Sequence, residues 1–507
     1  MKMIKSVPTE IREFLEKEGG SSIFFEGGSG TGKTTLGLQI IEEMSEQERS
    51  FYLSTRVSDE ALYQQFPWLE EKEMRAQVMD ASKVFLQAVY EEKNKDEDKK
   101  KAVPKEDKKK IEGAQKFLST IRDEGPPEEV DRTRLNQLEK DIPSLERVYD
   151  RIDDILPERS LVVIDSIEGI THKFGIDMET FVMTLQKDLV ENSNTNLIMI
   201  LEKDSAPDLE FLADGVVQLK RHQLEGRDVR EIMLKKLRAV EFNQPSYLMS
   251  LKGGRFKCFE PYELDISGGN EWDPVEAPKG KYSSGIEDLD DLLDGGFDAG
   301  SYNVFEIQEN VSNEEFFSVI RPLFLNFISQ RRGVISVLSG GTHPENLRDD
   351  LIRFVPEEKF NKKFRIVDHL SSQTDKSYKL ALAGKNQKQY RKIYNKSMRE
   401  LRGDEDRGIL DYHALDTLEY MRGGEMALQE LLSGVANTKN SDDIGVGILK
   451  PGLNLSRDIK NMADNYFVIL SINKTPCIYG VKPKTGLYAI VTDEEKGSPY
   501  IQLKQIV

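Results

Sequence analysis

The chain alternates short runs of apolar residues with segments whose apolar residues recur at helical spacing. In the first half, runs long enough for buried strands cover residues 22–26, 51–55, 160–165 and 196–202. Continuous apolar runs of this length are typical of strands covered on both faces in a parallel sheet. The segment that follows the first run places Leu36, Ile40 and Met44 on one helical face. The pattern predicts an α/β fold in which helices flank a mostly parallel sheet.

Three more strands follow each other closely, at residues 215–221, 230–238 and 246–251. The short connections, with an EGRD turn at 225–228, are typical of hairpins. We therefore expect antiparallel strands at one edge of this otherwise parallel sheet.

The second half repeats the strand pattern, beginning with the apolar run in RGVISVLSGG at 332–341. A chain of 507 residues is too long for one hydrophobic core. We expect one domain at 1–265, a linker rich in Gly, Asp and Pro at 266–281, and a second domain at 282–507.

A glycine-rich turn joins the first strand to the first long helix. It reads Gly27-x-x-x-x-Gly32-Lys33-Thr34, which is a complete P-loop signature in its proper strand–turn–helix setting. Glycines let backbone N–H groups surround phosphate oxygens, the lysine reaches the β- and γ-phosphates, and the threonine hydroxyl binds Mg²⁺. The turn predicts an ATP site made by Gly27, Gly28, Ser29, Gly30, Thr31, Gly32, Lys33, Thr34 and Thr35.

An acidic residue for the metal follows at the end of a later strand. The run SLVVID at 160–165 places Asp165 directly after buried apolar positions. A carboxylate at that place in a P-loop protein holds the magnesium ion together with the threonine of the loop. We therefore expect Thr34 and Asp165 to form the Mg²⁺ site.

The order of P-loop, strand-ending Asp-Ser and a hairpin that ends in Lys-Leu-Arg resembles the RecA-like ATPases of the KaiC group. The resemblance covers about 20–60 and 155–260 and implies an ATP site at an interface between subunits. It implies that Lys236 and Arg238 contact the nucleotide of a neighbouring subunit. Without the resemblance, these two residues would be equally compatible with solvated charges at a strand end.

The resemblance also identifies a departure at the second strand. The KaiC group has a pair of glutamates after this strand, and one of them activates the attacking water. Arg56 and Val57 occupy the aligned positions, and neither side chain can accept a proton from water. Asp59 or Glu60 would substitute only if the loop bends back. We expect ATP binding with slow or regulated hydrolysis, so that any enzymatic activity is that of a weak ATPase.

The segment KYSSGIEDLDDLLDGGFDAGS at 281–301 resembles the segment that leads into the P-loop in the KaiC group. Its presence in the second half indicates an internal duplication. On the same frame the second loop places Ile307 and Ser312 at glycine positions, followed by Asn313 and Glu314. Side chains would obstruct the turn, and the glutamate would repel a polyphosphate. The fold class is therefore α/β with two tandem RecA-like domains, of which the second is degenerate. In GILDYHAL at 408–415, Asp411 is the candidate remnant of the metal-binding aspartate.

Lysine and arginine gather in three segments. The mixed-charge run at 93–110 lies in a charged helical insert at about 90–155. We expect the run itself to be either a solvated excursion between helices or a disordered loop. The hairpin at 220–238 and the segment 379–402 are more basic, and the latter is an amphipathic helix with Tyr390 and Tyr394 on its apolar stripe. An ordinary surface helix would show the same pattern.

One N-terminal P-loop combined with two separate basic regions resembles the gas-vesicle regulators of the archaeal GvpD family. The short helix at 8–20 that leads into the P-loop strand strengthens the resemblance. It implies an ATP-binding regulator that acts on a partner protein and whose basic regions take part.

Composition limits the alternatives. The net charge of −18 disfavours a protein that coats nucleic acid, and no apolar run approaches the ~18 residues of a membrane span. The two cysteines, Cys258 and Cys477, predict buried free thiols in a reducing cytoplasm. We expect a cytoplasmic homo-oligomer that uses ATP and Mg²⁺, with partner docking on the C-terminal domain. The alternative is a DNA-binding ATPase similar to recombinase paralogues, whose basic segments would grip DNA.

Overall fold

The chain is described by a computed structural model, which covers residues 6–44, 49–70, 78–80, 148–149, 152, 158–263, 271–403 and 407–507. Most of the predicted insert at about 90–155 and the first part of the predicted linker at 266–281 lie outside the described residues. Two compact units are present: Met1–His222 with Arg230–Cys258, and Gln223–Val229 with Phe259–Val507. None of the described helices has the length and hydropathy needed to cross a membrane.

The first unit is built on a nine-stranded sheet in the order β3-β2-β4-β5-β1-β6-β7-β8-β9. The strands are β1 (Ser22–Glu26), β2 (Arg49–Ser54), β3 (Val78–Asp80), β4 (Ser160–Asp165), β5 (Thr195–Ile200), β6 (Gly215–Leu224), β7 (Arg227–Leu237), β8 (Ser246–Ser250) and β9 (Lys257–Phe259). Strands β1 to β5 pair in parallel, as their apolar composition predicts. The expectation of antiparallel edge strands holds for β7 with β8. Strand β6 lies beside β7 and is joined to it by two residues, which is the connection of an antiparallel hairpin. On its other side β6 pairs in parallel with β1.

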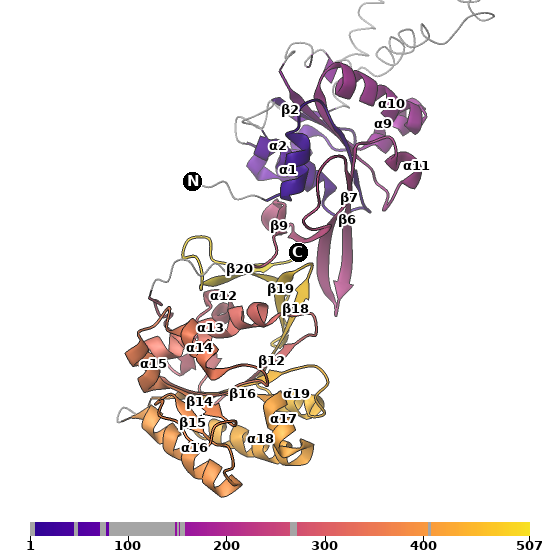
Figure 1. Cartoon of the computed structure of the whole chain (residues 1–507). Helices are drawn as coiled ribbons and strands as arrows, with labels where there is room; N and C mark the ends of the chain where they lie inside the picture. Colours follow the sequence, from indigo (N-terminus) through magenta and orange to yellow (C-terminus); the bar gives the residue numbers. More distant parts are fainter. Residues whose placement is uncertain are drawn as a thin grey trace, which may run out of the picture. The chain divides into compact units, whose positions relative to one another are not determined.

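Helices cover both faces of this sheet. They are α1 (Thr9–Leu15), α2 (Lys33–Met44), α3 (Asp59–Gln65), α9 (Ile167–Phe174), α10 (Met178–Leu185) and α11 (Pro207–Glu210), with short 3-10 or π segments η1 (Pro67–Glu70), η2 (Gln186–Asn192) and η3 (Lys252–Gly254). Helices α1 and α2 share one buried core with one side of the sheet, and α9 and α10 share another core with the other side (Figure 1).

The second unit is built on a ten-stranded sheet in the order β15-β14-β13-β16-β17-β12-β18-β19-β20-β21. Its strands are β12 (Tyr302–Ile307), β13 (Gly333–Val337), β14 (Phe364–Asp368), β15 (Lys379–Ala381), β16 (Ile409–Ala414), β17 (Ile444–Leu449), β18 (Asn465–Ile472), β19 (Thr475–Lys482), β20 (Leu487–Thr492) and β21 (Ile501–Gln505). A small hairpin, β10 (Lys281–Tyr282) with β11 (Phe297–Asp298), precedes them.

The two sheets have the same connectivity. The strand order of the second sheet, counted from β14, matches that of the first sheet counted from β3. In this alignment β12 corresponds to β1, and β16 corresponds to β4. The prediction of two α/β lobes with mostly parallel sheets is confirmed, and the common strand order supports an internal duplication.

The helices of the second unit also lie on two faces. They are α12 (Glu287–Leu292), α13 (Asn313–Ser329), α14 (Pro344–Leu351), α15 (Glu357–Lys363), α16 (Gln387–Arg402), α17 (Leu415–Arg422), α18 (Gly424–Lys439) and α19 (Ser456–Met462). Helices α13 to α15 cover one face of the parallel strands, while α16 and α18 cover the other (Figure 1).

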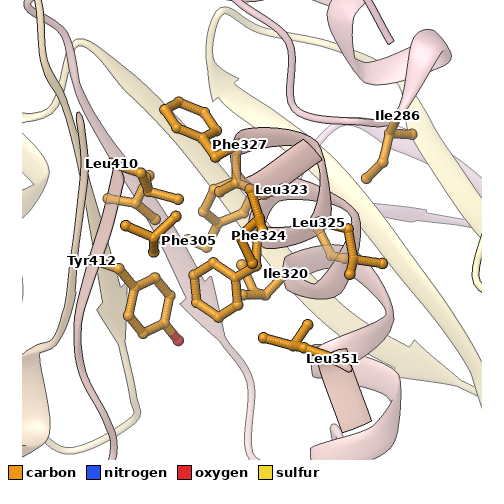
Figure 2. Packing of buried hydrophobic residues seen from close by; sticks show 14 of the residues in the cluster. Ile286, Phe305, Ile320, Leu323, Phe324, Leu325, Phe327, Leu351, Leu410 and Tyr412 are labelled. Atoms are coloured by element: carbon orange, nitrogen blue, oxygen red, sulfur yellow. The ribbon is translucent and has the colours of Figure 1, made fainter. Parts of the chain in front are cut away.

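The largest core of the second unit forms around α13 (Figure 2). Phe324 is 1% exposed, and its ring meets the rings of Phe364 and Tyr412 edge-on, with centroids 5.2 and 5.0 Å away. Trp272, which belongs to the predicted linker, is 3% exposed and stacks on Tyr500. Part of the predicted linker therefore packs into the second unit, because the Trp272 ring is buried in its core.

Both cysteines are buried and free, as predicted. Cys258 lies in β9, and Cys477 lies in β19.

We expect Phe324→Ala to lower the free energy of unfolding of the second unit by about 3–5 kcal/mol, because it leaves a large cavity between α13 and the sheet. The chain has two tryptophans, one in each unit. Chemical denaturation followed by the fluorescence of Trp272, in a Trp68→Phe background, reports on the second unit alone.

Leu370→Ala is the matched control, since Leu370 is 90% exposed in the same unit. It should change the free energy of unfolding by less than about 0.5 kcal/mol. Equal effects of the two substitutions would contradict the assignment of Phe324 to the centre of this core.

Candidate nucleotide-binding site

The P-loop lies between the carboxyl end of β1 and the first turn of α2. Its backbone has φ values of 153° at Gly27, 73° at Gly30 and 110° at Gly32, a range that side chains disfavour. A Cβ at Gly27 would also lie 2.6 Å from the carbonyl oxygen of Leu219. The loop can follow this path only with glycines, as a close backbone wrap around phosphate requires.

Lys33 is 4% exposed and is held by oxygen atoms of its own loop. Its Nζ donates to the carbonyl oxygens of Gly27 at 2.6 Å and Gly28 at 2.8 Å. It also lies 3.3 Å from a carboxylate oxygen of Glu202. A bound triphosphate would have to replace these partners of the ammonium group.

Thr34 and Asp165, the two predicted magnesium ligands, lie together. The Thr34 hydroxyl donates to Oδ2 of Asp165 at 2.6 Å, and the hydroxyl of Tyr52 donates to the same oxygen at 2.5 Å. Burial raises the pKa of Asp165, while these hydrogen bonds lower it. Hydroxyl and carboxylate oxygens are the ligands that Mg²⁺ prefers, so the pair fits the ion. Among the described residues, no group of three or more His, Cys, Asp or Glu side chains could hold a metal by itself.

Glu202 is a site residue that the sequence analysis missed. It follows β5, and its carboxylate lies between Lys33 and Arg56, whose Nη1 is 3.5 Å away. The backbone N–H of Glu202 donates to Oε1 of Glu168 at 2.9 Å. The only signal in the sequence is that the strand NLIMILE at 196–202 ends in an acid, as the strand ending in Asp165 does.

The residues that replace the glutamate pair differ in their surroundings. Arg56 is 55% exposed and points toward Glu202, while Val57 packs against the core beneath α2. Asp59 and Glu60 lie in the first turn of α3, where Ser58 caps the helix. A carboxylate is therefore present near Lys33, but it comes from the end of β5 and not from the loop after β2.

Arg230 is a second missed contact of the loop. It is 8% exposed, and its Nη1 donates to the carbonyl oxygen of Gly30 at 2.7 Å. Strand β7 thereby fixes the tip of the P-loop through a charged donor. The sequence shows Arg230 only as one member of a basic hairpin.

Lys236 and Arg238 do not lie near the P-loop of their own chain. Lys236 donates to the carbonyl oxygen of Ala213 at 2.6 Å, and Arg238 forms an ion pair with Asp214 at 2.7 Å. Asp214 in turn accepts from the N–H of Ser22, at the amino end of β1. The P-loop follows the carboxyl end of the same strand, so Lys236 and Arg238 lie at the opposite end of β1 from the P-loop of their own chain. Their contact with the nucleotide of a neighbouring subunit stays a prediction.

The second unit closes the corresponding loop with its own side chains. Ser312 caps α13 by accepting from the N–H of Glu315 at 3.2 Å, and the Glu315 carboxylate accepts from the N–H of Ser312 at 2.7 Å. The other Glu315 oxygen accepts from the hydroxyl of Ser471. This capping box satisfies N–H groups that would otherwise bind phosphate.

The strand register does not support Asp411 as the remnant of the metal-binding aspartate. In the first unit Asp165 pairs with Ile200, which pairs with Phe25, two residues before the loop begins. In the second unit the same path leads from Phe305 through Ile448 to Ala414. An alanine therefore holds the place of the metal-binding aspartate, and Asp411 lies three residues earlier.

Comparisons with known proteins agree with the division of the chain into two units. The sequence pattern of the P-loop domain of the GvpD gas vesicle protein matches residues 11–235. The pattern described as GvpD basic region 2 matches residues 271–377. The basic helix expected at 379–402 therefore begins after that region ends.

Two relatives from Halobacterium salinarum share this similarity. Protein GvpD2 is 24% identical over 99% of this chain and 97% of its own length. Protein GvpD1 is 25% identical over 70% of this chain and 60% of its own length. The similarity to GvpD2 extends over both units.

Glu202→Gln should increase the affinity for ATP about three- to tenfold. The change removes one anionic partner of Lys33 and one negative charge that opposes the polyphosphate. Isothermal titration with Mg·ATP measures the change. Asp208→Asn, which removes an exposed charge from α11 in the same unit, should leave the affinity unaltered. Weaker binding by the Glu202 variant would mean that this carboxylate supports the nucleotide.

Proposed function

The chain belongs to the GvpD family of gas vesicle proteins, and on that premise we propose that it is an ATP-binding regulator of gas vesicle formation. The first unit binds one Mg·ATP, and the second unit is the lobe on which a partner protein docks. The supporting observation is the asymmetry of the two loops: Lys33, Thr34 and Asp165 converge in one, and a capping box closes the other.

In this proposal the chemistry of the site comes from charge and position. Lys33 would exchange its loop carbonyls for phosphate oxygens, and Thr34 and Asp165 are the residues that would hold a magnesium ion. When bound, the ion would supply positive charge beside the β- and γ-phosphates. Tyr52 keeps the Asp165 carboxylate oriented through its hydrogen bond.

We propose that hydrolysis is slow. Arg56 stands where the attacking water would need a base, and the carboxylate of Glu202 is paired with two cations. Glu202 would have to leave Lys33 and Arg56 before its carboxylate could orient a water. ATP then acts chiefly as a bound signal, and its turnover depends on a rearrangement of these charges.

A homo-oligomer would complete the site. Because Lys236 and Arg238 lie at the amino end of β1, a neighbouring subunit that offers them to the P-loop would link nucleotide binding to assembly. The charged residues of α16, most of which are exposed, give the second unit a basic face for an acidic partner.

Lys33→Ala should weaken the binding of ATP by roughly 10- to 100-fold, since it removes a charge-assisted hydrogen bond to the phosphates. Equilibrium binding of labelled ATP measures the loss, and its saturation should give one nucleotide per chain. Lys173→Ala, an exposed lysine on α9, is the control. Two bound nucleotides, or unchanged affinity without Lys33, would contradict the proposal.

Arg56→Glu should raise the rate of ATP hydrolysis by at least about tenfold, because it supplies the missing base. Steady-state release of phosphate is the measurement. Arg56→Gln frees Glu202 without adding a carboxylate, and it separates the two explanations. If both variants are equally fast, the arginine inhibits only by occupying Glu202. Stimulation of hydrolysis by DNA would instead favour the DNA-binding alternative.

A further inference from the structure

Four positions on one face of the second sheet have lost the apolar side chains that fill them in the first. These positions lie on the two central strands that α9 and α10 cover in the first unit and that α16 and α18 cover in the second (Figure 1). By strand register, Val162 corresponds to Asp411, Ile164 to His413, Leu197 to Gly445 and Met199 to Gly447. All four first-unit residues are fully buried core members. Two ionisable groups and two glycines in a sheet centre do not serve packing.

The replacement opens a cavity of about 640 Å³ between this face and the two helices. Tyr302 lies across the two glycines, since a Cβ at Gly447 would come within 2.3 Å of its hydroxyl oxygen. Tyr302 is 3% exposed, and within the described part of the chain its hydroxyl has no hydrogen-bond partner. A buried hydroxyl without a partner costs about 1–3 kcal/mol, so the Tyr302 hydroxyl is available to a polar group that enters the cavity.

Asp411 and His413 form a polar trio with Tyr394 of α16. The Tyr394 hydroxyl donates to Asp411, and Nε2 of His413 lies 2.8 Å from the same carboxylate oxygen. Nδ1 of His413 is buried and lacks a hydrogen-bond partner among the described residues. Burial lowers the pKa of His413, but the Asp411 carboxylate outweighs it and the net pKa is raised. Nδ1 is therefore an acceptor when the ring is neutral and donates from Nε2, and a donor when the ring is protonated, so it can contact a polar group in the cavity in either state.

Two of the three acids that line the cavity are paired with arginines, and the third is Asp411 of the trio. Asp443 is paired with Arg402, and Glu430 is paired with Arg422 at 3.0 Å. Arg391 and Arg399, which also line the cavity from α16, are exposed and have no acidic partner in the described ranges. The polar groups without partners are therefore two guanidinium groups at the rim and two buried groups inside.

We propose that this cavity binds a small organic anion, whose phosphate or carboxylate group is held by Arg391 and Arg399 and whose polar body reaches Tyr302 and His413. The volume is in the range of ordinary metabolite sites. The second unit would then sense a metabolite through a site that is separate from the P-loop and independent of ATP binding in the first unit.

The test uses the full chain with Lys33→Ala, so that the P-loop does not contribute. Thermal unfolding of the second unit is followed by Trp272 fluorescence, in the Trp68→Phe background, with about 1 mM orthophosphate, AMP or citrate. Binding should raise the midpoint by at least about 2 °C with one of these probes. A response to orthophosphate or AMP indicates a phosphate ligand, and a response to citrate alone indicates a carboxylate.

Arg391→Ala/Arg399→Ala should abolish the shift. Lys392→Ala/Lys396→Ala removes the same charge from the same helix outside the cavity and should retain the shift. Equal responses of the two double variants, or no response of the parent to any probe, would overturn the proposal.

A triple variant separates a binding role from a structural one. Asp411→Val and His413→Ile install the residues of the first unit, and Tyr394→Phe removes the remaining partner. If the trio serves a ligand, the triple variant should lose the shift and unfold without anion at the same or a higher temperature. A lower midpoint without anion would show that the trio stabilises the fold, and the proposal would be wrong.

Discussion

The free backbone N–H groups at the start of one helix determine what each unit can bind. The first turn of an α-helix has N–H groups with no partner inside the helix. In the first unit the residue before α2 is Gly32, which has no side chain to accept from them. In the second unit Ser312 and Glu315 form the reciprocal capping box of α13. One helix start therefore needs an external acceptor such as phosphate, and the other is complete without one. Two exchanges at the helix start, a capping residue for glycine and an acid three positions later, provide the reciprocal hydrogen bonds of the second unit.

The lead-in to the closed loop is retained because the fold uses it. Both carboxylate oxygens of Asp290 accept hydrogen bonds from Ser283 and Ser284, inside the core that α12 and α13 share. Gly285 has a φ of 81°, and a Cβ there would lie 2.5 Å from the carbonyl oxygen of Pro322. The motif thus fixes the entry into the sheet by packing and by buried hydrogen bonds. A nucleotide is not required for any of these contacts, so the loss of the site leaves the lead-in under the same physical constraint.

Local patterns predicted the strands, the P-loop and the closed second loop, because each depends on residues that are neighbours in the chain. Three features depended on register or on contacts between distant segments. Asp411 looked like the end of its strand, but pairing with β17 places Ala414 there. Glu202 gains its role only because β5 ends beside Lys33, and Trp272 leaves the predicted linker because Tyr500 of the C-terminal tail offers a stacking partner.

The two lobes show that one sheet offers a ligand two separate places, and that the loss of one does not constrain the other. The carboxyl edge depends on loop backbone and on a helix start, while the helix-covered face depends on the side chains of the central strands. In the first unit the face is filled by Val162, Ile164, Leu197 and Met199, so that only the edge is available. In the second unit the loop after β12 is closed by its capping box. The polar face is tolerated because the opposite face carries the large aromatic core around Phe324 (Figure 2). A lobe that is stable through one face can therefore leave the other face to binding.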